Sequence, residues 1–312
     1  MADVKKIATR QAYGEFLAEY GAERKDLIAM SADLSGSNKT DIFEKAFPER
    51  FIEAGISEQD MYAEAAGIAH SGHVVAASTF AMFAAGRAYE IIRNSIAHTN
   101  ANVKVCATHG GITVGEDGAS HQTFEDIALM RVLPNMTVIN PADAVSAKKL
   151  LRQEFEREGC AYVRLGRSGV PVVYSEDADI QIGKAMELRA GNDVAIIATG
   201  IMVAAALEAA EALEAEGISA RVIDMHTIKP VDEDMIVRAA SECRGIVTAE
   251  EHSVIGGLGG AVAEVTSQKC PCRIAMVGQH DCFGESGKPA ELLEKYGMTA
   301  ADIVKAAEEI VK

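Results

Sequence analysis

The chain alternates between short apolar runs rich in β-branched residues and longer amphipathic segments. In the first half, the short runs predict buried parallel strands at residues 27–31, 74–78, 103–108, 137–139 and 161–165. The segments between them have helical periodicity and predict helices at residues 10–20, 59–71, 80–97 and 144–158. The sequence Asn140-Pro141-Ala142-Asp143 supplies a turn and an N-cap before the last of these helices.

A second alternating series begins after Tyr174. It predicts strands at 194–199, 220–225, 245–249 and 273–276, and helices at 202–216, at 232–240, after the glycines of 256–260 and from Thr299. Gly217 fits a helix C-cap, and Thr299 with Asp302 fits a capping box. Two such series predict an α/β fold with two doubly wound domains and mostly parallel sheets.

The segment 167–183, which is rich in Pro, Gly, Ser and acidic residues, separates the two series. We therefore expect a first domain at 1–175, a linker at 176–190 and a second domain at 191–312. Ligands of doubly wound sheets bind outside the carboxyl ends of the strands. The loops after Ser78, Thr108 and Leu165 are therefore expected to carry the chemistry.

The charge balance narrows the choice of partners. The chain has 312 residues, 48% of them hydrophobic, and a formal net charge of −16. An acidic chain is not expected to bind nucleic acid or anionic membranes in bulk. The sequence has no signal-peptide pattern and no apolar run of about 20 residues. Six cysteines are too few for a disulfide framework, and Cys270, Cys272 and Cys282 lack a fourth zinc ligand. These features predict a cytoplasmic protein without a metal site of its own.

The densest group of polar residues is THGGITVGEDGASHQ, residues 108–122, directly after a predicted strand. His109, Glu116, Asp117 and His121 lie there among four glycines. Two imidazoles and two carboxylates on one loop can bind hydroxyl groups, move protons or ligate a metal. The alternatives are a solvated loop and a mononuclear metal site made by His109, Asp117 and His121.

Two further features have both a structural and a functional interpretation. Glu58 follows Ser57 at a helix start, where an acid complements the helix dipole and Ser57 with Asp60 can form a capping box. On the residues alone, this structural interpretation is favoured. Phe80 and Phe83 share one helical face, which is typical of core packing and also suits the binding of a flat ring.

Three scattered residues could bind an anion: Arg10, Ser37 in DLSGSNKT and Arg167 in VRLGRSG. Guanidinium groups match the geometry of phosphate. Ordinary surface ion pairs are the alternative for each arginine.

Taken together, the motifs resemble the carboxyl-terminal half of the transketolase family. SADLSGSN, RFIEAGISEQ, STFAMFAAGRAYE, THGGITVGEDGASHQ and RVLPNMTVINPAD match in order, and DMHTIKP and EEHSVIGGLGG resemble the second domain. The resemblance implies a pyrimidine-binding domain followed by a transketolase C-terminal domain. The family's first domain, with its G-D-G signature, has no counterpart in this sequence. The chain therefore resembles the small subunit of a split transketolase, whose partner is an N-terminal, diphosphate-binding subunit in an α2β2 assembly with self-association.

The resemblance also implies roles for individual residues. Thiamine diphosphate would be shared with the partner, which would hold Mg²⁺ or Ca²⁺. Glu58 matches the acid that hydrogen-bonds N1′ of the aminopyrimidine, and Phe80 and Phe83 match rings beside the pyrimidine. The groups implied at the sugar and its phosphate are His109, Asp117, His121, Arg10, Ser37 and Arg167. Glu58, His109 and His121 are the implied catalytic residues.

The implied reaction transfers a two-carbon ketol unit from a ketose phosphate to an aldose phosphate, as in the pentose phosphate pathway. Half of a deoxyxylulose-phosphate synthase and a 2-oxo acid dehydrogenase β-subunit are alternatives within the enzyme class. A non-catalytic regulatory paralogue and a metal hydrolase using the 109–121 loop are alternatives outside it.

Overall fold

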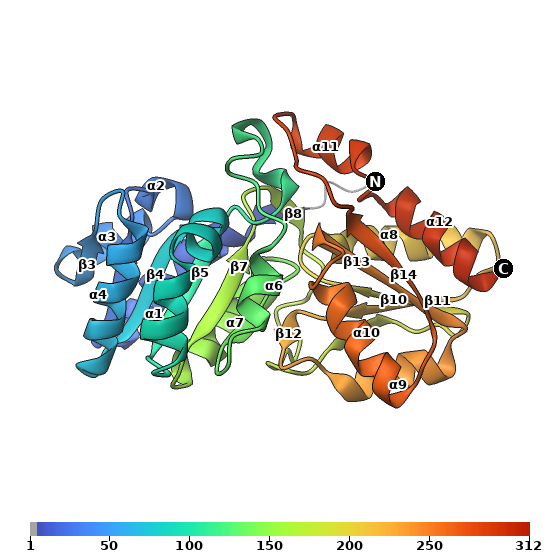
Figure 1. Ribbon diagram of the computed structural model, residues 1–312, viewed down its shortest axis with the longest axis horizontal. Helices are drawn as coiled ribbons and strands as arrows, with labels where there is room; N and C mark the ends of the chain where they lie inside the picture. Colours follow the sequence, from blue (N-terminus) through green and yellow to red (C-terminus); the bar gives the residue numbers. More distant parts are fainter. Residues whose placement is uncertain (1–4) are drawn as a thin grey trace.

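The computed structural model describes residues 5–312, and these form two α/β domains with mostly parallel sheets, as predicted (Figure 1). Residues 1–4, which the expected first domain includes, lie outside the described part of the chain.

The first sheet has seven strands in the order β12-β6-β7-β5-β4-β2-β3. Five of them were predicted: β2 (Leu27–Ser31), β4 (Val74–Phe80), β5 (Val103–Thr108), β6 (Thr137–Ile139) and β7 (Ala161–Leu165). The sequence pattern did not indicate β3 (Phe51–Glu53). It also missed β12 (Thr227–Lys229), which comes from the second half of the chain and pairs antiparallel with β6. The second half therefore completes the edge of the first sheet.

Helices cover both faces of this sheet. On one face, α1 (Thr9–Glu23) and α7 (Ala144–Glu156) pack around Tyr13, Phe16 and Phe155. On the other face lie α4 (Glu58–His70), residues 83–97 and α6 (Asp126–Arg131). The short helices α2 (Ser35–Asn38) and α3 (Asp41–Ala46) follow β2.

The helix predicted at 80–97 is wrong in its start and its type. Phe80 is the last residue of β4, because Thr79 and Phe80 pair with Ala107 and Thr108 of β5. A short α-helix, α5 (Tyr89–Ile91), lies between two π-helical segments, Phe83–Arg87 and Ile92–Ala97. Such π-helical turns often mark functional sites. The first of the two segments begins shortly after Phe80 in the chain.

The second sheet has the strand order β14-β13-β10-β11-β9. Its strands are β9 (Met186–Arg189), β10 (Val194–Ala198), β11 (Ala220–Asp224), β13 (Gly245–Ser253) and β14 (Arg273–Gln279). α8 (Met202–Ala215) and α12 (Ala300–Val311) cover one face, and α9 (Glu233–Glu242) and α10 (Leu258–Lys269) cover the other. α11 (Pro289–Lys295) lies at the top of Figure 1, beside the 112–117 segment.

Local sequence signals were reliable at two helix starts. Asp143 caps α7 in a capping box with Ser146, and Thr299 caps α12 in the predicted box with Asp302. Gly217, with a φ of 82°, follows α8 as expected of a C-capping glycine.

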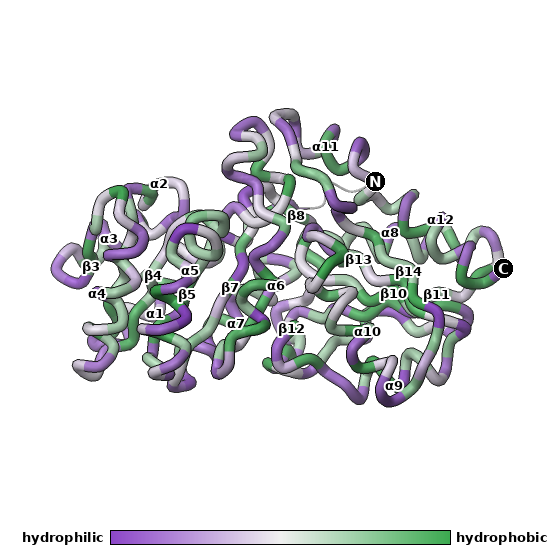
Figure 2. The backbone as a smooth tube through the Cα atoms, viewed as in Figure 1, coloured by the Kyte–Doolittle hydropathy of each residue, from purple (hydrophilic) through white to green (hydrophobic). Residues whose placement is uncertain are grey.

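The two domains share buried surface. One apolar cluster joins Ile112 and Val145 of the first half to Val203 and Leu213 of the second. Figure 2 shows the hydrophobic strands in the interior and hydrophilic residues around the edges. In the described residues, no helix is both long and apolar enough to cross a bilayer. All six cysteines are free.

Candidate active site

The expected site residues gather at the carboxyl ends of neighbouring strands of the first sheet. Phe80 ends β4 and pairs with Thr108, which ends β5, so His109 follows directly beside Phe80. The rings of Phe80 and His109 stack with centroids 3.8 Å apart. This is the strand-end position where doubly wound sheets bind ligands.

Glu58 is the first residue of α4, and its side chain is only 2% exposed. Arg87 Nη1 donates a hydrogen bond of 2.9 Å to Glu58 Oε2. Within residues 5–312, this bond to Oε2 is the side-chain contact of the carboxyl group, and no hydrogen bond to Oε1 is formed. The side chain of Ser57 does not cap α4, so the capping box expected with Asp60 is wrong. Glu58 is thus a buried acid with one oxygen held by a cation and the other free.

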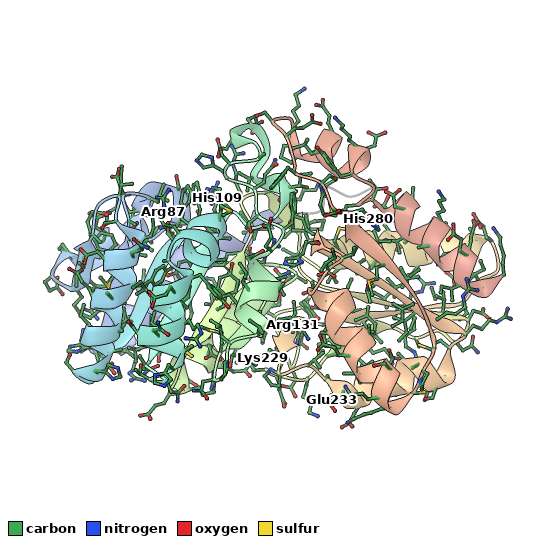
Figure 3. All side chains as sticks on the ribbon, viewed as in Figure 1. Arg87, His109, Arg131, Lys229, Glu233 and His280 are labelled. Carbon is green, nitrogen blue, oxygen red and sulfur yellow. The ribbon has the colours of Figure 1, made fainter. Side chains whose placement is uncertain are left out.

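An aromatic wall lies beside this acid. The rings of Phe80 and Phe83 are nearly parallel, with an interplanar angle of 12° and centroids 5.8 Å apart. His121 approaches Phe83 edge-on at 5.5 Å, and the Arg87 guanidinium lies 4.9 Å from the centre of the Phe83 ring. Figure 3 labels Arg87 and His109 close together along the upper edge of the first domain.

His109 is held in one protonation state. Its backbone has a φ of 61°, which is uncommon for a residue other than glycine. Arg10 Nη1 lies 3.2 Å from Nε2, and because arginine can only donate, Nε2 must be an acceptor. Nδ1 therefore carries the proton and donates to Thr108 Oγ1 at 2.8 Å. Burial, with Arg10 and Arg167 nearby, lowers the pKa of His109 to about 3, so the ring is neutral at physiological pH.

Two arginines face this neutral ring. The pairing of β1 (Lys6–Ala8) with β8 (Gly169–Pro171) brings the start of α1 beside Arg167. Burial lowers the pKa of Arg10, and the positive charge of Arg167 lowers it further. A second positive charge near Arg10 favours the binding of an anion here.

Other groups fix the two cations in place. Arg10 Nη1 donates to the backbone carbonyl of Ser37 at 2.7 Å, so Ser37 enters the site through its main chain. Arg167 Nη1 donates to Val114 O and, at 2.9 Å, to Glu116 Oε2.

Asp117 stands apart from this group. Its side chain is exposed, and among the described residues it has no polar partner. The structure therefore brings together Glu58, Phe80, Phe83, His109, His121, Arg10, Ser37 and Arg167, but leaves Asp117 on the rim.

The residues do not favour the metal alternative. Both ring nitrogens of His109 already have hydrogen-bond partners, and the partner of Nε2 is the positively charged Arg10. Across residues 5–312, no cluster of three His, Cys, Asp or Glu side chains is arranged to hold a metal ion.

Sequence reasoning missed two residues. Arg87 lies inside the STFAMFAAGRAYE motif, where its spacing from the two phenylalanines could have indicated it. Glu251, in EEHSVIGGLGG, contacts the 108–122 loop from the second domain. Thr113 and Glu251 are 138 residues apart, so no local pattern could have revealed this contact.

Two family models match most of the chain. Residues 5–172 match the family described as "Transketolase, pyrimidine binding domain", and residues 183–303 match "Transketolase, C-terminal domain". A Methanocaldococcus jannaschii protein named as a transketolase C-terminal section is 50% identical, over 97% of this chain and 96% of its own length. The 6-deoxy-6-sulfo-D-fructose transketolase subunit SqwH of Clostridium sp. (strain MSTE9) is 40% identical, over 97% of this chain and 94% of its own length.

A solved structure extends the match to three dimensions. The structure described as "Split gene transketolase, inactive beta4 tetramer" is 54% identical, with a TM-score of 0.92 over 98% of each chain. The transketolase family depends on thiamine diphosphate. The chain belongs to the transketolase family, of which it contains the pyrimidine-binding and C-terminal domains.

Proposed function

We propose that this chain is the small subunit of a thiamine-diphosphate-dependent transketolase that acts on sugar phosphates in the cytoplasm. It transfers a two-carbon ketol unit from a ketose phosphate to an aldose phosphate. The observation that carries the proposal is the buried Glu58, with one free carboxyl oxygen, beside the parallel rings of Phe80 and Phe83.

These residues fit an aminopyrimidine ring. A flat heteroaromatic ring needs apolar faces and one polar group at its edge, and the two phenylalanines and Glu58 Oε1 provide these. Arg87 holds the other oxygen of Glu58 and contacts the Phe83 ring, so the acid and the wall are fixed to each other. Bound thiamine diphosphate would supply the nucleophilic carbon and hold the electrons of the transferred unit.

The residues of the chain itself then bind, orient and hold protons. With the cofactor bound, Glu58 would share a proton between Oε1 and the ring nitrogen. The half-buried His121 exchanges hydrogen bonds with sugar hydroxyls, and neutral His109 does so when a hydroxyl group replaces Arg10 or Thr108 as the partner of a ring nitrogen. Arg10 and Arg167 receive the phosphate, and Asp117 is free on the rim to meet a hydroxyl group.

The proposal includes a partner. A diphosphate-binding subunit would hold the rest of the cofactor and its Mg²⁺ or Ca²⁺, in an α2β2 assembly in which this chain also contacts a second copy of itself. Support comes from the names of two relatives, one a C-terminal section and the other a split-gene product that forms a tetramer of β chains. Because another relative is named for a sulfonated ketose, donors beyond the pentose phosphate pathway belong in the assay.

The test is reconstitution. The purified chain is mixed with the diphosphate-binding subunit, thiamine diphosphate and Mg²⁺, and is assayed with a ketose phosphate plus an aldose phosphate. Ketol transfer by the mixture supports the proposal. Turnover only with pyruvate and glyceraldehyde phosphate would identify a deoxyxylulose-phosphate synthase instead. Absence of any turnover in a stable complex would favour a regulatory paralogue.

A further inference from the structure

The second domain holds the 108–122 loop by direct hydrogen bonds. The backbone N–H of Thr113 donates to Glu251 Oε1 at 2.6 Å, and both groups are buried. At the end of the loop, Gln122 Nε2 donates to the carbonyl of Glu285 at 2.9 Å. In Figure 1 the loop stands next to α11 and the strand ends of the second sheet.

Three glycines of the loop lie against the second domain. A Cβ at Gly111, which has a φ of 85°, would overlap the carboxyl group of Glu251. A Cβ at Gly118 would lie 2.5 Å from Ser286 Oγ, and one at Gly115 would lie 3.3 Å from Pro289. These glycines therefore allow close approach of the second domain as well as unusual backbone angles.

Glu251 is itself fixed in place. It is 3% exposed and lies in the buried part of β13, where Arg164 Nη2 donates to its carbonyl at 3.0 Å. Arg164 Nη1 lies 4.0 Å from Glu251 Oε2, and the same guanidinium is bound to Asp126 at 2.7 Å. A buried carboxylate needs such a partner, and the arrangement leaves Oε1 directed at Thr113.

We propose that Glu251 is a positioning residue, through which the C-terminal domain fixes the loop that carries His109, Asp117 and His121. The contribution of this domain to the reaction is then to hold the substrate-binding loop in its working shape. The substrate part of this inference rests on the proposed function, whereas the loop part does not. Glu58 lies on α4, Phe80 on β4 and Phe83 on the π-helical segment Phe83–Arg87, so we expect their positions not to depend on Glu251.

Two conservative variants separate the effect of the length of the Glu251 side chain from the effect of its charge. Glu251→Gln keeps an oxygen at the position of Oε1 but removes the charge. Glu251→Asp keeps the charge beside Arg164, but its shorter side chain cannot reach Thr113. Glu250→Gln is the matched control, because Glu250 is equally buried on the same strand and accepts from Leu258 N and Gly259 N inside its own domain.

The first measurement is hydrogen–deuterium exchange of the 109–122 peptide in the full chain, with and without the partner subunit. We expect Glu251→Asp to speed exchange of this peptide at least about tenfold, whereas Glu251→Gln and Glu250→Gln leave it near the wild-type rate. Equal exchange in all four proteins, or loss of protection in the Gln variant, would overturn the proposal.

The second measurement uses the reconstituted enzyme. We expect Glu251→Asp to raise KM for the ketose phosphate about tenfold with a smaller change in kcat. Glu251→Gln should leave KM near the wild-type value. If the wild-type complex has no ketol-transfer activity, the proposed function fails, but the exchange experiment still decides the role of Glu251. If activity is present and KM is unchanged in Glu251→Asp, the positioning role is wrong.

Discussion

The two sides of the candidate site are built in different ways. Glu58 lies at the start of α4, Phe80 at the end of β4 and Phe83 at the start of the π-helical segment Phe83–Arg87. Their positions follow from regular elements of one domain. The loop from His109 to Gln122 is irregular, contains three glycines with positive φ, and is held by the second domain.

This difference separates the two tasks of the proposed enzyme. A cofactor that is common to the whole family needs a constant pocket, and strand and helix ends provide a rigid one. Sugar substrates differ between relatives, and loops on a rigid scaffold can vary without changing the fold. We therefore expect substitutions of Glu58, Phe80 or Phe83 to affect kcat. Substitutions around the 108–122 loop should affect substrate affinity.

The largest effect is expected from Glu58→Gln. This substitution keeps the size of the side chain but removes the carboxyl proton that Glu58 would share with the ring nitrogen. We expect kcat of the reconstituted enzyme to fall by about 10² or more, with far-UV circular dichroism unchanged. If the variant keeps wild-type kcat, Glu58 does not have the proposed role in proton sharing with the cofactor ring.

A smaller effect, on the other side of the site, is expected from Arg167→Gln. Loss of one charge-assisted hydrogen bond to phosphate should raise KM for the phosphorylated donor by about ten- to a hundredfold, with a smaller change in kcat. Arg152→Gln on α7 is the control, because Arg152 pairs with Glu23 at the surface. A fall in kcat with unchanged KM would contradict the division of tasks.

The neutral state of His109 can be tested through stability. Below pH 6.5 the unfolded imidazole binds a proton, whereas the folded ring, with a pKa of about 3, does not. Falling pH therefore favours the unfolded chain, by up to about 1.4 kcal/mol per pH unit for this group.

Urea unfolding between pH 7.5 and 5.5 would measure this effect. His226, whose pKa burial lowers to about 4, acts in the same direction, and Asp224, whose pKa burial raises to about 8, acts in the opposite one. The diagnostic quantity is therefore the difference between wild type and His109→Asn. We expect the wild type to lose about 1 kcal/mol more than the variant over this range. Parallel pH profiles would mean that His109 is charged.

The smallest effects concern helix starts. Thr299→Ala should lower the free energy of unfolding by about 1 kcal/mol, because it removes the capping box of α12. Ser57→Ala should change it by less than about 0.5 kcal/mol, because the Ser57 side chain makes no cap at α4. A larger loss of unfolding free energy for Ser57→Ala would show that Ser57 caps α4 after all, as the structural interpretation of this helix start requires.

The parts of the fold predicted from sequence are those that local residues determine. Strand and helix alternation and the caps at Asp143 and Thr299 depend on neighbours a few positions apart. The extension of β4 to Phe80 and the crossing of β12 to the first sheet depend on strand pairing between distant segments. The same reason explains the site: the motifs indicated Glu58 and His109, but the contacts of Arg87 and Glu251 exist only in the folded chain.

Whether ketol transfer needs a second subunit can be tested by measuring the activity of the chain with and without the diphosphate-binding subunit. We predict that the isolated chain transfers almost no ketol units, even with saturating thiamine diphosphate and Mg²⁺, and that the complex is active. Full activity of the isolated chain would contradict the account, because it would require a complete cofactor site on these 312 residues.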